Sequence, residues 1–439
     1  MNDKPVVTRF PPSPTGLLQA GNARTAVFNY LFAKKHGGTF VVRIEDTDRE
    51  RSKKEFEQNI LDTLEWLGFP YDSFFRQSDN AARHKEVLGQ LIEQGHAYVS
   101  KETPKEEGQR SEVIRFKNPN APVTFTDIIR GDITVDTTDL GDFVIARSMD
   151  EPLYHLGVVV DDFDEGITHV IRGEDHISNT PRQILILRAM GADIPLYAHL
   201  PLVFGKDGKK LSKRTGAKAM TQYRDEGFLP EAMVNYLALL GWHPEGEKEL
   251  FTVEELCREF TLERIQKSSG VFDEVKLRWF NHEHMKLLSL EEFTAGLRAF
   301  MKEDLPSYID LICTELKNRS QTYGDAAELL RNGEFSFMKD TIPTPSKELL
   351  LQGAKAEADA VKNNLQKILE LLGATEVFTS ESVKEAIFPY ATEQGRASVL
   401  WPMRVALSGK EKSPDPFTLA GLVGKDRTLS RIEKALKIL

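Results

Sequence analysis

Arginine and glutamate side chains stand at the ends of two short apolar segments near the start of the chain. Arg9 closes segment 5–9, and Glu45 follows segment 39–44. The carboxyl ends of parallel strands meet at one edge of a sheet, where ligands bind in open α/β folds. An arginine and a glutamate at such an edge could bind the two opposite charges of an amino acid. The alternative is a proline-rich turn beside a surface ion pair, and spacing alone does not choose between them.

Two further charged segments could face the same crevice. Segment 206–214 reads KDGKKLSKR, in which Asp-Gly favours a turn and the lysines form a cationic loop. Such a loop suits a polyphosphate whose charge builds up during a reaction. Arg172 ends the predicted strand 167–171, so we expect its side chain at the same edge. A solvated charge run and an exposed charged turn are the alternatives for these two segments.

The elements around these groups indicate a parallel sheet. Segments 5–9 and 39–44 are short and apolar, and segment 23–35 between them has apolar residues at helical spacing. A strand, a helix and a strand form a βαβ unit with a right-handed crossover. Gly16 and Gly21 both stand before this helix, where they would let a phosphate approach free N–H groups.

The rest of the chain divides into a mixed part and a helical part. Residues 99–150 carry short β-like runs separated by turn residues, which predicts a small insertion with its own sheet. Further elements are expected as follows: helices over 52–68, 81–95 and 181–190, the last with Thr180 as N-cap, and strands over 157–160, 167–171 and 200–204. Helical patterns dominate after about residue 217.

Composition bounds the class of protein. The chain has 439 residues, 40% of them hydrophobic and 28% charged, which predicts about two to four folded domains. No apolar run approaches the ~18 residues of a membrane helix, and the start carries no apolar signal region. Cys257 and Cys313 have no metal-ligand spacing, which favours a reducing cytoplasm. The net charge of -10 argues against nucleic acid, but basic clusters at 206–214 and 425–437 leave that class open.

The charged segments belong to five motifs that follow one another along the chain. They are PSPTG (12–16) with GNARTA (21–26), RIEDTD (43–48), YHLGVVVDD (154–162), RGEDH (172–176) with NTP (179–181), and KLSKR (210–214). In this order the set resembles the motifs of class I glutamyl-tRNA synthetases of the bacterial type. The match of the whole set is far more specific than any single motif.

The resemblance implies an α/β multidomain protein. A Rossmann-type catalytic domain with a β-containing insertion would precede an all-helical C-terminal anticodon-binding region. The implied domains are a first catalytic half (1–75), a connective insertion that binds the tRNA acceptor end (76–150), a second catalytic half (151–205), a signature loop with a stem-contact domain (206–305), and the helical anticodon-binding region (306–439).

The resemblance also implies roles for individual positions. Glutamate would be bound by Arg9, Ser13, Glu45, Tyr154 and Arg172. ATP would be bound by Gln19, Gly21, Glu174, the backbone at Leu202 and Val203, Lys210 and Lys213. The catalytic groups would be Lys210, Lys213 and Gln19, and the tRNA contacts would be Arg404 and Arg319. Two arginines and one acid suit a substrate with two carboxylates and one ammonium group.

The implied reaction is the ATP-dependent ligation of L-glutamate to tRNA-Glu. The glutamate carboxylate would attack the α-phosphorus of Mg²⁺-bound ATP, and the terminal ribose hydroxyl of tRNA would then attack the glutamyl-adenylate. Positioning and electrostatic stabilisation would supply most of the catalysis. The family therefore implies Mg²⁺ with ATP and a cytoplasmic monomer with no membrane partner.

The chain departs from the family pattern at two places. The first signature motif usually starts with histidine, where this chain has Gln19, which donates a hydrogen bond but carries no positive charge. Many relatives place a cysteine-bearing zinc element near 97–113, where this chain has no cysteine. His282 and His284 lack further nearby ligands in the sequence, so no zinc is predicted.

Other functions share part of this pattern. A glutamyl-queuosine tRNA-Asp synthetase has the catalytic motifs but lacks the anticodon-binding region, and glutaminyl-tRNA synthetase has distal β-barrels where this chain is predicted helical. A non-discriminating enzyme that also charges tRNA-Gln remains an alternative. So does a catalytically weakened paralogue that only binds tRNA. Gln19 supports the paralogue, whereas the intact set of Arg9, Glu45, Arg172, Lys210 and Lys213 argues against it.

Overall fold

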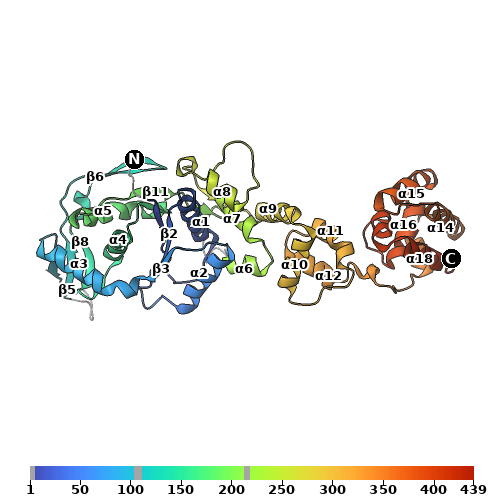
Figure 1. Cartoon of the computed structure of the whole chain (residues 1–439), viewed down its shortest axis with the longest axis horizontal. Coiled ribbons are helices and arrows are strands. Elements are labelled where there is room, and N and C mark those ends of the chain that lie inside the picture. The colour runs from blue at the N-terminus through green and yellow to red at the C-terminus, as the bar shows by residue number, and fades with distance from the viewer. Residues whose placement is uncertain (1–4, 103–110, 212–217) are drawn as a thin grey trace. The chain divides into compact units, whose positions relative to one another are not determined.

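A computed structural model of the chain describes residues 5–102, 111–211 and 218–439 (Figure 1). The chain forms two compact units, Met1–His284 and Met285–Leu439. In the described ranges, no helix is both long and apolar enough to cross a membrane.

Parallel strands form the centre of the first unit. In sheet order, the strands are β1 (Val7–Phe10), β2 (Thr39–Ile44) and β3 (Ser73–Arg76) in one sheet, and β10 (His169–Gly173), β11 (Leu196–Leu200), β6 (Val123–Asp127) and β7 (Gly131–Val135) in a second. The Thr168 N–H donates to Val7 O at 3.1 Å, which joins β10 to β1. Helix α1 (Ala20–Lys35) links the parallel pair β1 and β2, so the predicted βαβ unit is present.

Two hydrophobic cores lie on opposite faces of the central strands, because successive strand residues point to opposite faces. Phe40 and Val42 of β2 pack in the core that contains α1. Val41 packs in the other core, with α4 (Tyr154–Asp164) and α5 (Thr180–Ala189). Figure 1 shows α1 and α4 on either side of β2. Helices therefore cover both faces, as expected for a Rossmann-type fold.

Other elements complete the first unit and lead into the second. The helices are α2 (Lys54–Trp66), α3 (Ala81–Glu93), α6 (Met220–Asp225), α7 (Pro230–Leu239), α8 (Val253–Glu259) and α9 (Glu274–Leu287). Strands β12 (Val203–Phe204) and β13 (Gly270–Val271) pair in parallel. The predicted helices 52–68 and 81–95 correspond to α2 and α3.

Residues 157–160 were predicted as a strand, and this prediction was wrong, because they lie inside α4. All four are buried, and a continuous apolar run does not distinguish a buried strand from a buried helix. The helix matters for the site because its last turns bring Asp161 and Asp162 into the interior.

The β-rich segment 99–150 forms strands, but they divide between two sheets. An antiparallel sheet contains β4 (Ala97–Lys101), β5 (Glu112–Phe116), β8 (Phe143–Ser148) and β9 (Glu151–Pro152). The β6–β7 hairpin instead extends the sheet of β11, where Asp127 pairs with Tyr197. The expectation of one separate insertion sheet was therefore wrong for this hairpin.

Two predicted boundaries also differ from the structure. The single strand expected over 200–204 is interrupted after Leu200, because Pro201 cannot donate to a strand ladder. Thr180 is the first residue of α5, and the N-cap is Asn179.

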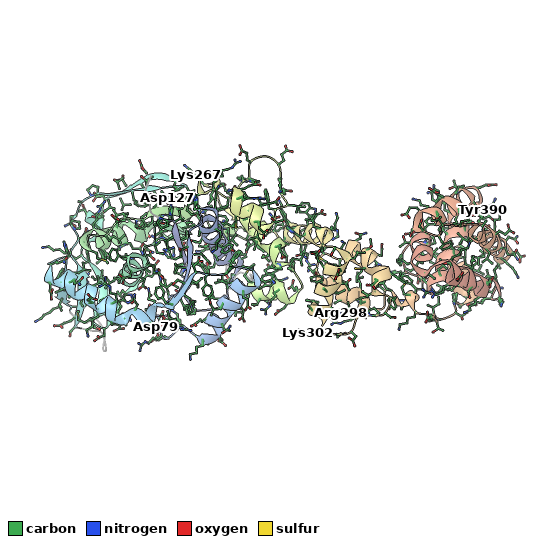
Figure 2. The ribbon with its side chains drawn as sticks, viewed as in Figure 1. Asp79, Asp127, Lys267, Arg298, Lys302 and Tyr390 are labelled. Carbon is green, nitrogen blue, oxygen red and sulfur yellow. The ribbon has the colours of Figure 1, made fainter. Side chains whose placement is uncertain are left out.

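The second unit is helical throughout its regular elements, which confirms the predicted helical C-terminal region. Its helices are α10 (Leu290–Met301), α11 (Ile309–Arg319), α12 (Tyr323–Arg331), α13 (Lys347–Gln352), α14 (Ala358–Gly373), α15 (Ser380–Gln394), α16 (Arg396–Ser408), α17 (Pro416–Val423) and α18 (Lys425–Leu436). Tyr390, labelled in Figure 2, donates to Asn364 Oδ1 at 2.8 Å and ties α15 to α14.

Candidate active site

A cavity of about 350 Å³ opens at the carboxyl ends of the central strands. Arg9 and Phe10 end β1, Glu45 follows β2, and Arg172 and Gly173 end β10. Many of the residues that the resemblance assigned to substrates line this one cavity: Arg9, Ser13, Gln19, Gly21, Glu45, Tyr154, Arg172, Leu202, Val203 and Lys210. Its position is the one in which open α/β sheets bind their ligands.

Arg9 is held by a carboxylate of helix α4. Its side chain is 1% exposed, and its Nε lies 3.2 Å from Asp162 Oδ1. Burial alone would raise the pKa of Asp162, but the charges of Arg9 and Arg43 hold it below the usual range. Arg9 Nη1 is buried and has no hydrogen-bond partner among the described residues. One edge of this guanidinium is therefore anchored, and another donor remains available to a ligand.

Arg172 is anchored in a similar way by a histidine. Its Nε donates to His199 Nε2 at 3.2 Å, and its Nη2 donates to Thr180 Oγ1 at 2.7 Å. His199 Nδ1 in turn lies 2.7 Å from Asp127 Oδ2, which fixes the ring. Burial lowers the pKa of Arg172. Within the described chain Arg172 Nη1 also lacks a partner, so Arg9 and Arg172 each keep one unsatisfied donor at this cavity.

Glu45 supplies the acidic group of the cavity. Its Oε1 accepts a hydrogen bond from Arg43 Nη2 at 3.2 Å. Burial raises the pKa of Glu45, and Arg43 opposes that rise. Arg43 is fully buried and also donates to Asp162 Oδ1 at 2.8 Å, so one guanidinium supports both Glu45 and the partner of Arg9. A substrate with two carboxylates and one ammonium group would complement this set.

The start of α1 forms another part of the wall. Gln19 is the N-cap of α1, and its Nε2 is buried without a partner in the part of the chain that the structure describes. A Cβ placed on Gly21 would meet no atom within 4 Å, so this side of the helix start is open. The N–H groups and the dipole of a helix N-terminus attract phosphate.

Lys210, the first residue of the KLSKR motif (210–214), also lines the cavity, and its Nζ lies 2.8 Å from Asp175 Oδ2. Lys213 lies outside the described residues. Glu174, expected near ATP, is not among the residues that line the cavity. It accepts a hydrogen bond from the Leu202 N–H at 2.9 Å and pairs with Arg130, so it supports the backbone that does line the cavity.

Tyr154 enters the cavity from the first turn of α4. Its hydroxyl lies 2.9 Å from His176 Nδ1. Burial lowers the pKa of His176 to about 4, so this imidazole is neutral near pH 7. Burial also raises the pKa of Tyr154, which keeps its hydroxyl as a hydrogen-bond donor.

The two predicted tRNA contacts lie in the second unit. Arg319 ends α11, its Nη2 lies 3.4 Å from Glu334 Oε2, and its guanidinium lies 5.7 Å from the Phe335 ring centroid. Arg404 of α16 donates to Glu411 O at 2.8 Å, and its guanidinium lies 4.7 Å from the Trp401 ring centroid.

The described residues contain no group of three His, Cys, Asp or Glu side chains placed to hold a metal ion. His284 is buried, and its Nε2 lies 2.9 Å from Asn235 Oδ1. Residues 103–110, part of the segment in which zinc was predicted to be missing, lie outside the described residues.

The sequence did not reveal the residues that hold Arg9 and Arg172 in place. Asp162 stood in one of the five motifs but was given no role. Asp127, His199 and Arg43 were given no role either. An acid at the end of an apolar run is one available signal for Asp162. Because Asp162 is 153 positions from Arg9, no spacing rule relates the two.

Comparisons with known proteins cover nearly the whole chain. A family model of class I tRNA synthetases (E and Q), catalytic domain, matches residues 5–112 and 101–279, and an anticodon-binding domain model matches residues 292–436. The glutamate–tRNA ligase of Nitrosospira multiformis is 40% identical over 98% of this chain and 98% of its own. That of Desulforamulus reducens is 36% identical over 98% and 99%.

Solved structures agree with the sequence relatives. A glutamate tRNA ligase from Elizabethkingia meningosepticum, in complex with its amino acid, has a TM-score of 0.83 at 31% identity and covers 99% of this chain and 100% of its own. The glutamate-tRNA synthetase of Elizabethkingia anophelis has a TM-score of 0.79 at 30% identity. The chain therefore belongs to the glutamate–tRNA ligases, within the class I tRNA synthetases.

Proposed function

We propose that the cavity at the strand ends binds L-glutamate and ATP and that the chain ligates glutamate to tRNA-Glu through a glutamyl-adenylate. The observation that carries this proposal is the pair of buried guanidinium nitrogens, Arg9 Nη1 and Arg172 Nη1, that lack partners in the described structure. In a substrate complex each would donate to a glutamate carboxylate. Glu45 would accept from the α-ammonium group, and Ser13 and Tyr154 would complete the pocket.

The other half of the cavity suits ATP. Gly21 and the N-terminus of α1 would take the phosphates, Gln19 Nε2 would donate to a phosphate oxygen, and the backbone at Leu202 and Val203 would lie beside the nucleotide. Lys210 and Lys213 would stabilise charge on the departing pyrophosphate. Glu174 would act through the backbone of Leu202, whose N–H donates a hydrogen bond to it. Mg²⁺ would arrive with ATP and neutralise phosphate charge.

The two displacements follow from this arrangement. The arginines and Glu45 orient glutamate so that its α-carboxylate oxygen attacks the α-phosphorus and pyrophosphate leaves. The terminal ribose hydroxyl of tRNA then attacks the activated carbonyl, and AMP leaves. Neither step requires a covalent bond to the protein, so positioning and fixed charges carry the catalysis.

The second unit would bind the anticodon. Arg404 and Arg319 are the proposed contacts, and each guanidinium is already held beside an aromatic ring. Side-chain freedom lost on binding would be small for a group held in this way. We propose that the enzyme works as a monomer in the cytoplasm, where its substrates tRNA and ATP are found.

Glutamate-dependent ATP–pyrophosphate exchange, with and without tRNA, tests the proposal directly. Charging is measured on tRNA-Glu and tRNA-Gln separately. Exchange together with charging of tRNA-Glu alone supports the proposal as stated. Charging of both tRNAs identifies a non-discriminating enzyme. Tight tRNA binding with no exchange under any condition overturns the catalytic assignment in favour of a paralogue that only binds tRNA.

A further inference from the structure

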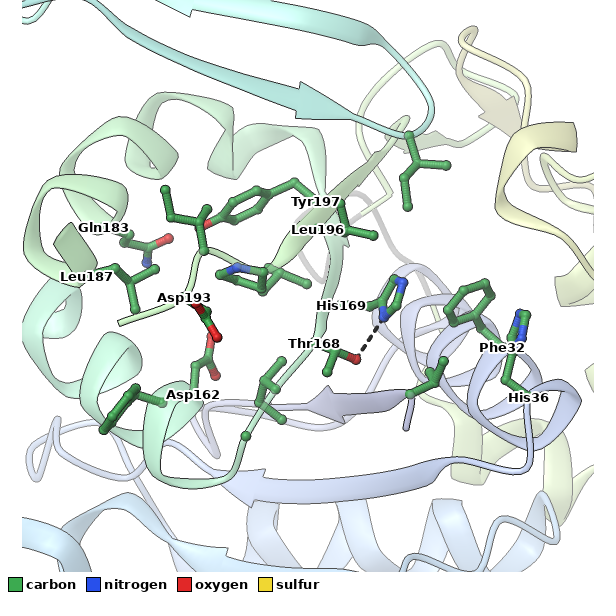
Figure 3. A pocket seen from close by; sticks show the side chains of 18 of the residues that line it. Phe32, His36, Asp162, Thr168, His169, Gln183, Leu187, Asp193, Leu196 and Tyr197 are labelled. Carbon is green, nitrogen blue, oxygen red and sulfur yellow. Dashed lines mark hydrogen bonds between the residues drawn. The ribbon is translucent and has the colours of Figure 1, made fainter. Parts of the chain in front are cut away.

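A second, larger cavity lies at the opposite edge of the same strands. Its volume is about 860 Å³, within the range of about 300–1,000 Å³ that is typical of small-molecule sites. Val6 precedes β1, His169 begins β10, and Leu196 begins β11, so the cavity lies at the amino ends of strands whose carboxyl ends form the active site. Figure 3 shows Gln183, Asp162 and the start of β10 around it.

Apolar side chains form most of the wall between α4, α5 and the strands. They include Val159, Ile167, Val170 and Leu187, and Figure 3 shows Leu187 beside Gln183 on α5. At the rim, three large apolar side chains remain exposed to solvent: Phe163 (43%), Ile194 (41%) and Leu196 (48%). Apolar groups gathered around a concavity are typical of a binding site rather than of scattered surface residues.

Gln183 adds a polar group that itself indicates a ligand. The residue is 3% exposed and lines the cavity. Its Nε2 is buried without a hydrogen-bond partner among the described residues. A buried unsatisfied donor is destabilising, so an acceptor in the cavity would be stabilising.

The charges around the cavity favour an uncharged occupant. Burial lowers the pKa of His169 to about 4, so this imidazole is neutral near pH 7. Asp162 is already paired with Arg9 and Arg43. Lys35, His36, Asp193 and Glu263 also line the cavity, so groups of both signs are present around it.

Two wall residues also contact the arginines of the active site. Asp162 pairs with Arg9, and the Tyr197 ring centroid lies 5.7 Å from the Arg172 guanidinium. We propose that this cavity binds an uncharged, largely apolar molecule with a hydrogen-bond acceptor, and that its occupancy changes the KM for glutamate. The effect on the KM rests on the function proposed above, whereas the binding of the molecule does not.

Nile red is a suitable probe, because it is an uncharged aromatic dye with a ring carbonyl and its emission rises in apolar surroundings. Titration into the full chain should give one saturable transition. Ile194→Asp puts a charge on the rim and should raise the Kd by about tenfold. Gln183→Leu keeps the volume but removes the donor, and should raise the Kd by about fivefold. Val377→Asp is the control, since Val377 is 70% exposed in the second unit.

Three results would overturn the binding site. The first is the absence of a saturable transition. The second is an equal Kd for Ile194→Asp and Val377→Asp, measured on folded proteins of matched melting temperature. The third is an unchanged Kd for Gln183→Leu. The last result would mean that the amide binds only water.

Regulation is tested by the KM for glutamate in pyrophosphate exchange with and without saturating dye. The KM should change by about threefold or more in the wild type and stay constant in Ile194→Asp. An unchanged wild-type KM overturns the regulatory clause. Absence of exchange in every sample would instead overturn the proposed function, and the dye titration would still decide the binding clause.

Discussion

Arg9 and Asp162 form a buried ion pair in which Arg9 Nε lies 3.2 Å from Asp162 Oδ1. The pair joins the end of β1 to the last turn of α4, and Arg43 contacts the same carboxylate at 2.8 Å. This arrangement fixes Arg9, because its Nε is engaged, and its unpartnered Nη1 would donate to the proposed substrate. Pre-positioned charge of this kind lowers the reorganisation needed during a reaction.

Replacing Asp162 with asparagine should therefore weaken glutamate binding. We expect the KM for glutamate to rise by about 10- to 100-fold, because hydrogen bonds to charged groups contribute about 1.5–3 kcal/mol. The KM for ATP should change far less. The free energy of unfolding should fall by about 3–5 kcal/mol, since removal of one partner leaves buried charge unpaired. Pyrophosphate exchange and thermal melting measure the two effects.

Asp164→Asn is the matched control for this variant. Asp164 lies on the same helix and pairs with Arg83 at the partly exposed surface. Exposed pairs contribute about 0–1 kcal/mol, so its KM and melting temperature should stay close to the wild-type values. Equal KM values for the two variants would contradict the positioning role of Asp162.

Lys210 is expected to act on the departing pyrophosphate. Lys210→Ala should lower kcat for exchange by about 100-fold, because the loss of one hydrogen-bond donor to a developing negative charge typically has an effect of this size. Lys206→Ala is the control, because Lys206 starts the same loop but pairs with Asp273 at 2.8 Å and does not line the cavity. A similar loss of kcat in both variants would point to the charge of the whole loop rather than to Lys210.

Gln19 stands where the family usually has histidine. Gln19→Ala should lower kcat by about 10- to 100-fold, because the buried Nε2 would no longer donate to a phosphate oxygen. Gln19→His should change kcat by less than about tenfold, since it restores a donor of similar reach. A much larger gain in Gln19→His would mean that the site is catalytically weakened.

The strand ends of the site were predictable from the sequence, and the groups that support them were not. Arg9, Glu45 and Arg172 each follow an apolar segment, and the parallel sheet brings such positions to one edge. Asp162 and His199 reach the arginines only through tertiary packing. The mistaken strand at 157–160 also hid Asp162, because a strand that ends at residue 160 leaves Asp162 outside it, whereas α4 continues to Asp164.

The β6–β7 hairpin illustrates a second limit. Its alternating pattern correctly predicted strands, but the pattern does not specify which sheet a hairpin joins. Its edge pairing with β11 brings Asp127 to His199, and so to Arg172. Part of the support for Arg172 thus comes from a segment that the sequence assigned to a separate insertion.

Arg404 is expected to affect tRNA and not glutamate. Arg404→Ala should lower kcat/KM for tRNA-Glu by about tenfold, the effect of one lost base contact. The KM for glutamate at saturating tRNA should be unchanged. Lys367→Ala, which removes an exposed cation paired with Glu370 on α14, is the control. Arg319→Ala should behave like Arg404→Ala, and an effect no larger than that of the control would remove either arginine from the tRNA contacts.

Glu165 should make stability depend on pH. Burial raises the pKa of this carboxyl to about 8, while Arg43, 2.8 Å away, opposes the rise. The folded protein therefore keeps a proton that the unfolded chain releases at its ordinary, lower pKa. The resulting stabilisation is fully present below the unfolded pKa and is lost as pH rises towards about 8, by up to about 1.4 kcal/mol per pH unit.

Glu165→Gln removes this titration and should flatten the pH dependence. The melting temperature of the variant relative to wild type should be higher near about pH 8.5 than near about pH 5, because other titrating groups, Glu45 and Asp162 among them, are common to both proteins. Glu86→Gln, at an exposed carboxylate paired with Arg83, should show a constant difference from wild type across this range. A constant difference for Glu165→Gln as well would mean that Glu165 is ionised beside Arg43 throughout, and that the Arg43 charge outweighs burial at this position.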